Sequence, residues 1–403
     1  MPSSVLYTAI GMKGYRHQSS SQVGGVFTLR MAAPETAVCC PVCKSKDVIR
    51  RGAVERVLYG PPIGMRKTRL FVTTPRVQCR KCPGLKTIRL PSVVPLKNHT
   101  TSFVRLVVDL RKVMTITDVA HYLGVSEGLI RTIDKTYLQR RFSKPKLCQL
   151  KALAIDEISV RKNHKYLTIV VDLKSGAVVF VGDGKGEKAL KPFWKRLRAS
   201  RAKIRAVATD MSSAYYKAVC ENLPEATHVF DRFHIVKLMN EKLTALRRQL
   251  HREADCLEKT VLKGTRWLLL MNPQNLSADR NEHQRLQEAL ALNEPLAIAY
   301  YLKEDLRQIW EQDGKREAGK FLTDWCRRAT ASGIGVLQTM ANTLQKHRRG
   351  ILAWYNYPIS TGPLEGLNNK IKTMKRQAYG FLDLEYFKLK IYALHLAKFE
   401  LIG

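Results

Sequence analysis

The chain has 403 residues and carries 69 Lys and Arg against 34 Asp and Glu, which gives a net charge of +35. Its hydrophobic content of 45% excludes a disordered chain or a collagen, and no apolar run approaches the roughly 18 residues of a membrane span. A positive surplus far above the roughly 2–8 charges that keep a small domain in solution favours a polyanionic partner, nucleic acid before a membrane.

Pattern and composition predict a multidomain α+β protein with five segments. Residues 1–98 hold short apolar stretches and five of the nine cysteines, 99–147 read as helices, 148–240 alternate strand and helix patterns, 241–350 are almost entirely helical in pattern, and a last helical segment spans 351–403. Residues 1–150 hold 26 Lys and Arg against 7 Asp and Glu. This first third is the more basic part per residue, so it is the first candidate for contact with DNA.

Two CxxC pairs lie in the first segment, Cys40 with Cys43 and Cys79 with Cys82, and 35 residues separate them. Each pair can place two thiolates on one tight turn, and two such turns complete a tetrahedral zinc site of the structural kind. The intervening residues include RVLYG and KTRLFVTTPRVQ, which predict a β-hairpin or small ribbon. Cys39 adjoins the first pair and could replace Cys40 as a ligand.

A helix-turn-helix pattern follows in Ile116–Phe142. The first helix has an apolar face, Gly124-Val125-Ser126 reads as a turn, and the Ser126 hydroxyl can cap the second helix. The second helix would present Arg131 and Lys135 to bases and phosphates, as a recognition helix does. The alternative is a helical hairpin that serves only packing.

Residues 148–240 alternate between strand and helix patterns. The predicted strands are Leu150–Val160, Lys165–Asp172, Ala177–Gly182, Ile204–Thr209 and Thr227–Phe230, and the predicted helices are Glu187–Ser200, Ser212–Leu223 and a long helix after Asp231. Three strands followed by helix, strand, helix, strand and helix is the element order of an RNase H-like fold.

Three acids fall where this fold does its chemistry. Asp156 lies on the first strand, Asp210 ends the fourth, and Glu365 lies in the first turn of a helix after Gly362 and Pro363. Carboxylates suit a pair of Mg²⁺ ions, with Mn²⁺ as an alternative, and two such ions activate a nucleophile and stabilise a leaving oxygen. Glu157 could compete with Asp156, but alternation along a strand places the two on opposite faces. Each acid could otherwise be a simple turn or strand-end residue.

Four blocks of sequence together resemble the motifs of the ISL-three-type insertion-sequence transposases, a bacterial family of DDE transposases. The blocks are AIDEISVRKNHKY, VATDMSSAYYKAV, FDRFHIVKLMN and STGPLEGLNNKIKTMKRQAYGF. The resemblance covers the whole chain and implies Asp156, Asp210 and Glu365 as the DDE triad. It also implies that Asp231 and His234 form a (C/D)xxH signature in which His234 contacts the scissile phosphate or supports the site. Asp231 as a helix cap beside a surface histidine is the alternative.

The resemblance implies a zinc-binding module at 1–98, a helix-turn-helix at 99–147 and a catalytic domain in two parts, at 148–240 and 351–403. It explains the 154 residues between Asp210 and Glu365 as including an all-helical insertion at 241–350. We expect a basic face on it, with Trp267 stacking on a displaced base, unless Trp267 is a core residue. The expected DNA-contacting residues of the insertion are Arg247, Arg248, Arg252, Lys259, Lys263, Arg266 and Trp267. Beyond Glu365, the candidates are Asn368, Lys370, Lys372, Lys375 and Arg376, which could also be a solvated face.

These features predict a cytoplasmic bacterial DNA transposase, associated with the nucleoid through DNA. It would bind the terminal inverted repeats of an insertion sequence, cleave the element ends and join the 3′-OH to target DNA. Two ends must be held together, so we expect a homodimer or a larger synaptic complex. The alternatives are a non-catalytic zinc and helix-turn-helix regulator, or a metal-dependent nuclease without strand transfer.

Overall fold

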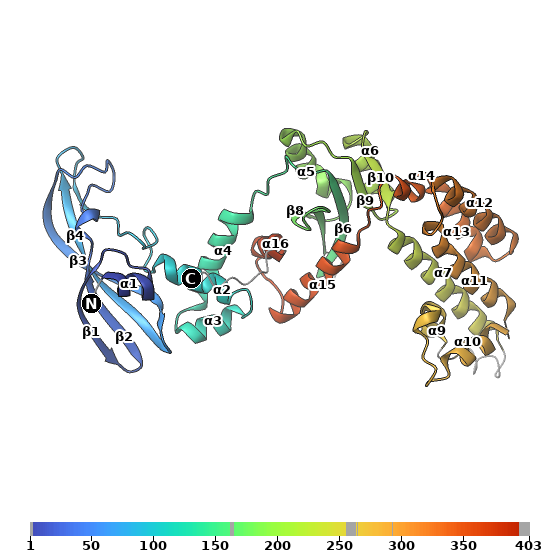
Figure 1. Cartoon of the computed structure of the whole chain (residues 1–403), viewed down its shortest axis with the longest axis horizontal. Coiled ribbons are helices and arrows are strands. Elements are labelled where there is room, and N and C mark those ends of the chain that lie inside the picture. Colours follow the sequence, from blue (N-terminus) through green and yellow to red (C-terminus); the bar gives the residue numbers. More distant parts are fainter. Residues whose placement is uncertain (1–2, 162–164, 255–262, 264, 292, 395–403) are drawn as a thin grey trace. The chain divides into compact units, whose positions relative to one another are not determined.

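The chain folds into two compact units, seen in a computed structural model that describes residues 3–161, 165–254, 263, 265–291 and 293–394 (Figure 1). The first unit contains the residues up to Ser143 together with Gln377–Leu389, and the second contains Lys144–Arg376 with Lys390–His395. Residues close to the C-terminus therefore pack with the N-terminal part of the chain. The sequence instead predicted residues 351–403 as one piece of the catalytic domain.

The N-terminal half of the first unit is a five-stranded sheet in the order β1-β2-β4-β3, with β5 also paired to β4. Its elements are α1 (Ser3–Ile10), β1 (Arg16–Val23), β2 (Val26–Ala32), β3 (Val48–Ile63), β4 (Arg66–Cys79) and β5 (Leu85–Thr87). β3 and β4 form the predicted hairpin, and alternate residues of β4 are buried, as the period of two requires. Leu58, Leu70 and Val72 lie in the core below it.

Three helices complete the N-terminal part, α2 (Thr101–Leu110), α3 (Ile116–Leu123) and α4 (Glu127–Phe142). Gly124 ends α3 in the left-handed region at φ 61°, where a glycine avoids the steric cost of a Cβ. Ser126 caps α4, because its hydroxyl accepts a hydrogen bond from the Leu129 N–H at 3.3 Å. The predicted turn and cap are therefore present between α3 and α4.

The segment Gln377–Leu389 joins these helices through a buried polar network. The Arg111 guanidinium lies 3.3 Å from the Asp134 carboxylate, and the Tyr386 hydroxyl donates a hydrogen bond to the same carboxylate. Lys135 and Asp383 form an ion pair at 2.6 Å nearby. These pairings account for the departure from the predicted boundary, because a buried charge is tolerated only beside its partners.

Replacing Asp134 with Ala is expected to lower the free energy of unfolding of the first unit by about 3 kcal/mol or more. Arg111 is only 8% exposed and would lose its carboxylate partner inside the protein. Urea denaturation followed by hydrogen exchange of the α3 and α4 amides measures this change. Asp109→Ala is the matched control, because Asp109 forms an exposed ion pair with Lys112. This substitution should lower the free energy of unfolding by less than about 0.5 kcal/mol. An Asp134→Ala change as small as the control would contradict the assigned role.

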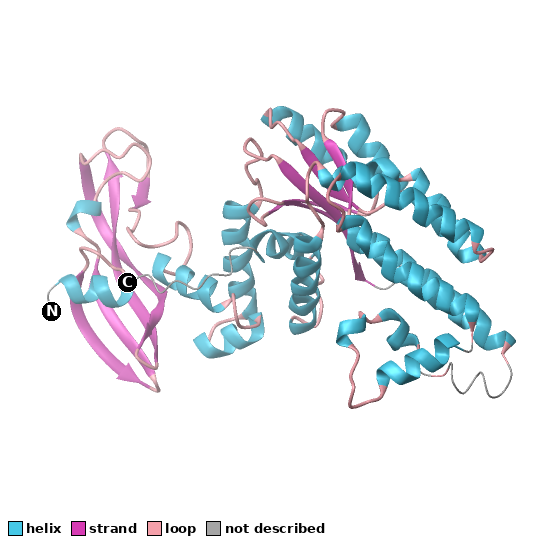
Figure 2. Cartoon of the chain, turned by 45° about the vertical axis from the view of Figure 1, so that its right-hand side comes forward, coloured by secondary structure: helices cyan, strands magenta, loops and turns pink. Residues whose placement is uncertain are grey.

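The second unit is built on a five-stranded sheet in the order β10-β9-β6-β7-β8 (Figure 2). The strands are β6 (Ala152–Arg161), β7 (Lys165–Asp172), β8 (Val178–Asp183), β9 (Ala206–Thr209) and β10 (Thr227–Phe230). β6, β7 and β8 are antiparallel neighbours, whereas β9 is parallel to both β6 and β10. Helices α5 (Glu187–Ser200) and α6 (Ser213–Asn222) share a core with the sheet, which includes Ile155, Phe193 and Val219. The predicted order of strands and helices is thus present.

After β10 the chain enters a helical region that begins with the long helix α7 (Arg232–Glu253). It continues through α9 (Arg266–Leu270), α10 (Glu282–Ala291), α11 (Glu294–Arg307), α12 (Lys315–Ala331), α13 (Gly335–Lys346) and α14 (Arg348–Leu352). One apolar core joins these helices, and Trp325 and Leu302 lie in it. No described helix is both long and apolar enough to cross a membrane.

The chain returns to the sheet domain through α15 (Gly362–Gln377) and ends in α16 (Leu384–Ala393). Both α7 and α15 begin beside the sheet: the Asp231 N–H donates to the Thr209 carbonyl at 3.0 Å, and Asn368 of α15 bonds to Asp156 of β6. The helical region is therefore inserted between two points of the sheet domain.

Candidate metal sites and nucleic-acid contacts

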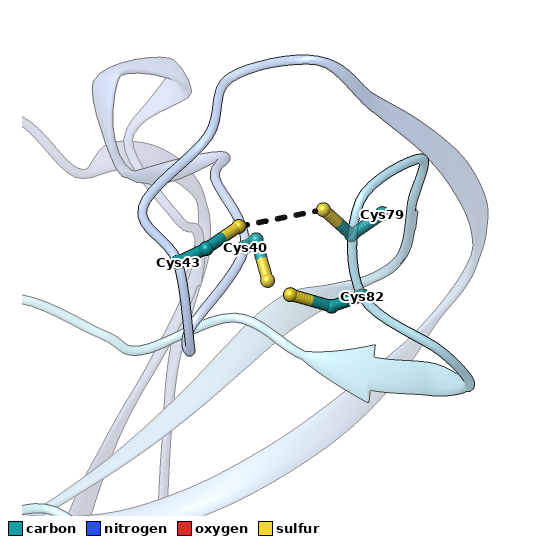
Figure 3. A group of neighbouring side chains, drawn as sticks. All are labelled: Cys40, Cys43, Cys79 and Cys82. Carbon is teal, nitrogen blue, oxygen red and sulfur yellow. Dashed lines mark hydrogen bonds between the residues drawn. The ribbon is translucent and has the colours of Figure 1, made fainter.

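Four cysteines of the first unit lie together at one end of the β3–β4 hairpin (Figure 3). The Sγ atoms of Cys40, Cys43, Cys79 and Cys82 all lie within 4.8 Å of one another, and those of Cys43 and Cys79 are 3.6 Å apart. Zn–S bonds of about 2.3 Å in a tetrahedron place sulfurs about 3.8 Å apart. The four thiols therefore fit zinc, and Cys39 is outside this group.

Local backbone geometry brings the first two thiols together. The Lys44 N–H donates to the Cys40 carbonyl at 3.0 Å, and Lys44 takes φ 63°, which turns the chain back on itself. Hydrogen bonds from the backbone N–H groups of Cys43 and Val42 lower the pKa of Cys40 to about 6. A thiolate is the form that binds zinc, so this turn favours the ligand state.

Asp156 lies on β6, and Asp210 directly follows the end of the neighbouring parallel strand β9. The pairing of β6 with β9 ends at Ala154 opposite Ala208, and each Asp lies two residues beyond that pair. Because side chains two residues apart on a strand point to the same face, both carboxylates lie on one side of the sheet. Burial raises the pKa of Asp156, and the nearby charge of Asp210 raises it further.

The Asp156 carboxylate is held by two hydrogen bonds. Its Oδ1 accepts from the Glu157 N–H at 2.7 Å, and its Oδ2 accepts from the Asn368 amide at 2.9 Å. Asn368 lies one turn after Glu365 on α15, so this bond ties the helix of the third acid to the strand of the first. Asn368 was predicted to bind DNA phosphates. Its spacing of three residues from Glu365 was the signal that the two share a face.

Glu157 points away from Asp156. Its Oε1 accepts a hydrogen bond from the buried Tyr215 hydroxyl of α6 at 2.6 Å. The Tyr215 hydroxyl oxygen also accepts a hydrogen bond from the Gly186 N–H at 3.2 Å, so the hydroxyl is fixed on that side of the sheet. The two neighbouring acids therefore have different partners, Asn368 of α15 for one and Tyr215 of α6 for the other.

Glu365 lies exposed in the first turn of α15, where its backbone N–H donates to the Thr361 carbonyl at 3.2 Å. Among the described residues, the four cysteines are the one group of three or more possible ligands within 4.8 Å of one another, so the three acids are more widely spread. The oxygens of Asp156, Asp210 and Glu365 are the hard donors that Mg²⁺ prefers. The buried Oδ1 of Asn368 has no hydrogen-bond partner among the described residues and adds another such donor.

His234 lies in the first turn of α7, half-buried, and its charge lowers the pKa of Asp156 against the effect of burial. Asp231 is 1% exposed and makes no capping hydrogen bond to α7. It accepts a hydrogen bond from the Thr361 hydroxyl instead. The interpretation of Asp231 as a helix cap is therefore wrong, because its carboxylate turns inward to Thr361.

The predicted DNA-contacting residues differ in their exposure and in whether they form ion pairs. Arg131 of α4 is exposed, whereas Lys135 is in the ion pair with Asp383, so its charge is already partly neutralised. On α15, Lys375 is half-buried and the other basic candidates are exposed, namely Lys370, Lys372 and Arg376. These side chains follow Glu365 along the same helix.

Trp267 of α9 is 65% exposed, while the adjacent Leu268 and Leu269 are buried. The interpretation of Trp267 as a core residue is therefore wrong, because the two leucines provide the buried face of this short helix. The Arg266 guanidinium lies 4.9 Å from the Trp267 ring centre. Burial and the charges of Arg248 and Arg266 lower the pKa of Arg247, so these three arginines lie near one another. Lys259 lies outside the described residues.

Comparison with known proteins gives a consistent assignment. A family model for ISL3-type DDE transposases, described as a transposase, matches residues 153–391. The transposase for insertion sequence element IS1001 of Bordetella parapertussis is 31% identical over 392 residues, which cover 95% of this chain and 96% of that protein. The chain belongs to the ISL3-type DDE transposase family. A zinc-finger model of the IS204, IS1001, IS1096 and IS1165 transposases matches residues 36–82, which include all four clustered cysteines.

Two further relatives are more distant. The transposase for IS1557 of Mycobacterium tuberculosis is 28% identical to this transposase, over 89% of this chain and 86% of that protein. A structural match to the solved Drosophila P element transposase strand transfer complex includes 73% of this chain and 91% of the matched chain in that complex. The identity is 12% and the TM-score is 0.38. That likeness is too low to establish a common fold. The zinc-finger family model and the four clustered cysteines together support a structural zinc ribbon in this transposase.

Proposed function

We propose that this transposase cuts DNA at the ends of an insertion sequence and joins the 3′-OH to target DNA, with Asp156, Asp210 and Glu365 as its catalytic acids. One observation carries the proposal: Asp156 on β6 and Asp210 just after β9 each lie two residues beyond the last pair of these parallel strands, and Asn368 ties the glutamate helix to Asp156. The strand order β10-β9-β6-β7-β8 supports an RNase H-like catalytic domain.

The three acids would hold two Mg²⁺ ions, or Mn²⁺ in their place. When bound, such ions lower the pKa of the attacking water or 3′-OH and stabilise the leaving oxygen of an in-line displacement. Asn368 orients the Asp156 carboxylate, and His234, in the first turn of α7, would contact the scissile phosphate or support the site. The basic residues further along α15 would bind the phosphates on either side. Because the carboxylates hold metals, no covalent protein–DNA intermediate forms.

End recognition belongs to the first unit. The zinc ribbon and the α3–α4 pair would bind the terminal inverted repeats, with Arg131 on the exposed side of α4 as a contact to base edges or phosphates. Trp267 and three arginines, Arg247, Arg248 and Arg266, would hold a displaced base and its phosphates. Both ends must be held at once, so we propose a homodimer or larger synaptic complex that acts on DNA in the bacterial cytoplasm.

The strand-transfer assay tests this function directly. Purified protein is mixed with a pre-cleaved duplex of the DNA that flanks its gene, Mg²⁺ and a target plasmid. Joined product that depends on the 3′-OH is the expected result, and a 3′-dideoxy end is the control that should give none. End binding without cleavage of intact ends would indicate a regulator. Cleavage of intact ends without joining would indicate a nuclease, and either outcome would contradict the proposal.

A further inference from the structure

The helical insertion leaves and re-enters the sheet domain at two residues that touch each other. The insertion begins after Asp231, at the start of α7, and ends at Thr361, just before α15. The Thr361 hydroxyl donates a hydrogen bond to the Asp231 carboxylate, although 130 positions separate the two residues in sequence. Both residues are buried, at 1% and 3% exposure. The bond therefore closes the insertion at its base.

This contact lies in a continuous chain of hydrogen bonds between two of the catalytic acids. The Asp231 N–H donates to the carbonyl of Thr209, the residue immediately before Asp210, at 3.0 Å. On the other side, the Thr361 carbonyl accepts the N–H groups of Leu364 at 2.8 Å and Glu365 at 3.2 Å. The backbone of Asp210 is thus linked to that of Glu365 through one side-chain contact.

The same contact adjoins the core of the insertion. Phe230, which precedes Asp231, packs in the apolar core shared by the insertion helices. Gly350 approaches the Phe230 ring so closely that an added Cβ would lie 2.4 Å from it. A tightly packed junction transmits displacement, because close-packed interiors do not deform continuously. A movement of the insertion at this junction therefore reaches Asp231.

A simple structural role does not account for the charge at this position. Asp231 Oδ1 is buried and has no hydrogen-bond partner among the described residues, and an unpaired buried polar atom costs free energy. A buried polar atom of this kind calls for an explanation, and a role at a functional site is one.

We propose that Asp231 and Thr361 are positioning residues that set the location of Glu365 relative to Asp210. The proposal rests on the proposed function, since it concerns the same three acids. Neither residue is required to touch the DNA. Their hydrogen bond holds the first turn of α15 in a fixed position relative to the end of β9. It also links that position to the packing of the insertion.

The test is Thr361→Val, which keeps the shape of the side chain and removes the hydrogen-bond donor. We expect strand cleavage to fall about tenfold and the Mg²⁺ concentration for half-maximal cleavage to rise about fivefold, because a loosened Glu365 weakens the metal site. Thr361→Ser should restore both values. Thr244→Val on α7 makes the same chemical change at a half-buried hydroxyl that bonds only its own helix, and it should change neither value.

A second measurement is independent of turnover. Fe²⁺ with ascorbate and peroxide cuts a polypeptide near a bound metal, so the wild-type chain should be cut both near Asp156 and near Glu365. Thr361→Val should lose the cut near Glu365 and keep the one near Asp156. Asp231→Ala should behave in the same way. The double variant should lose no more of the cut near Glu365 than either single variant, because both residues act through one hydrogen bond.

The outcomes separate the two proposals. Wild-type protein that binds end DNA but neither cleaves nor joins it would contradict the proposed function. Wild-type protein that cleaves, together with a Thr361→Val variant of unchanged rate, Mg²⁺ dependence and Fe²⁺ cutting, would overturn the positioning role alone. Circular dichroism and end-binding affinity equal to wild type show that the variants are folded, and a Thr361→Val variant that loses its fold would also count against a positioning role.

Discussion

Asp156→Asn is expected to reduce strand cleavage and strand transfer by about 1,000-fold or more, while the affinity for end DNA stays unchanged. The amide keeps the size of the side chain and one of its two hydrogen-bond acceptors, but it removes the negative charge that holds a divalent cation. The loss should appear in single-turnover assays with both Mg²⁺ and Mn²⁺. Fluorescence anisotropy of labelled end DNA measures the binding that is expected to survive.

The chain offers a matched control one residue away. Glu157→Gln removes an equal charge from the same strand, but Glu157 faces Tyr215 and not Asn368. A glutamine oxygen can still accept the Tyr215 hydroxyl, so cleavage should stay within about threefold of wild type. Equal losses in the two variants would mean that charge on the strand, and not a metal site at Asp156, governs activity.

Removal of zinc should unfold the cysteine turns and abolish end binding, while the sheet of the first unit persists. Cys79→Ser, or chelation of the wild-type protein, removes a binding free energy on the order of 10 kcal/mol from this small region. The apolar core of the sheet includes Leu58 and Leu70 and none of the four cysteines, so its strands have their own stabilisation. Circular dichroism should retain the strand signal, and anisotropy should show the loss of affinity.

Cys39→Ser is the control for the zinc experiment, because Cys39 lies outside the group of sulfurs within 4.8 Å. The Cys39→Ser variant should bind one equivalent of zinc, and it should bind end DNA with the affinity of the wild type. A wild-type protein that carries no zinc, or a Cys79→Ser variant that binds ends with full affinity, would contradict the role assigned to the cluster.

The strands of the catalytic domain were predictable because buried, β-branched runs such as Lys165–Asp172 have a single period and clear turn residues at their ends. The edge strand β1 was not predicted, since RHQSSSQV is polar and exposed along almost its whole length. An edge strand of this kind is specified by pairing with its neighbour and leaves little hydrophobic signal.

The candidate site was predictable at the level of residue type and less so at the level of contacts. The acids could be selected because Asp156 interrupts an apolar strand, Asp210 directly follows a strand and Glu365 lies in the first turn of a helix. The bond between Asn368 and Asp156 joins residues 212 positions apart, and the bond between Thr361 and Asp231 joins residues 130 positions apart. Polar pairs of this kind have no periodicity in sequence, so they can be identified only from the folded structure.

The buried network of Arg111, Asp134 and Tyr386 has a consequence for how the protein is made. The first unit ends at Ser143 in its N-terminal part and is completed only by Gln377–Leu389. Synthesis at about 5–20 residues per second separates these two parts by roughly 10–50 s. During that interval Asp134 and Arg111 lack Tyr386, so α4 lacks part of the packing around it. If α4 binds DNA as proposed, a nascent chain would reach its full affinity for an element end only after the residues up to Leu389 have been synthesised.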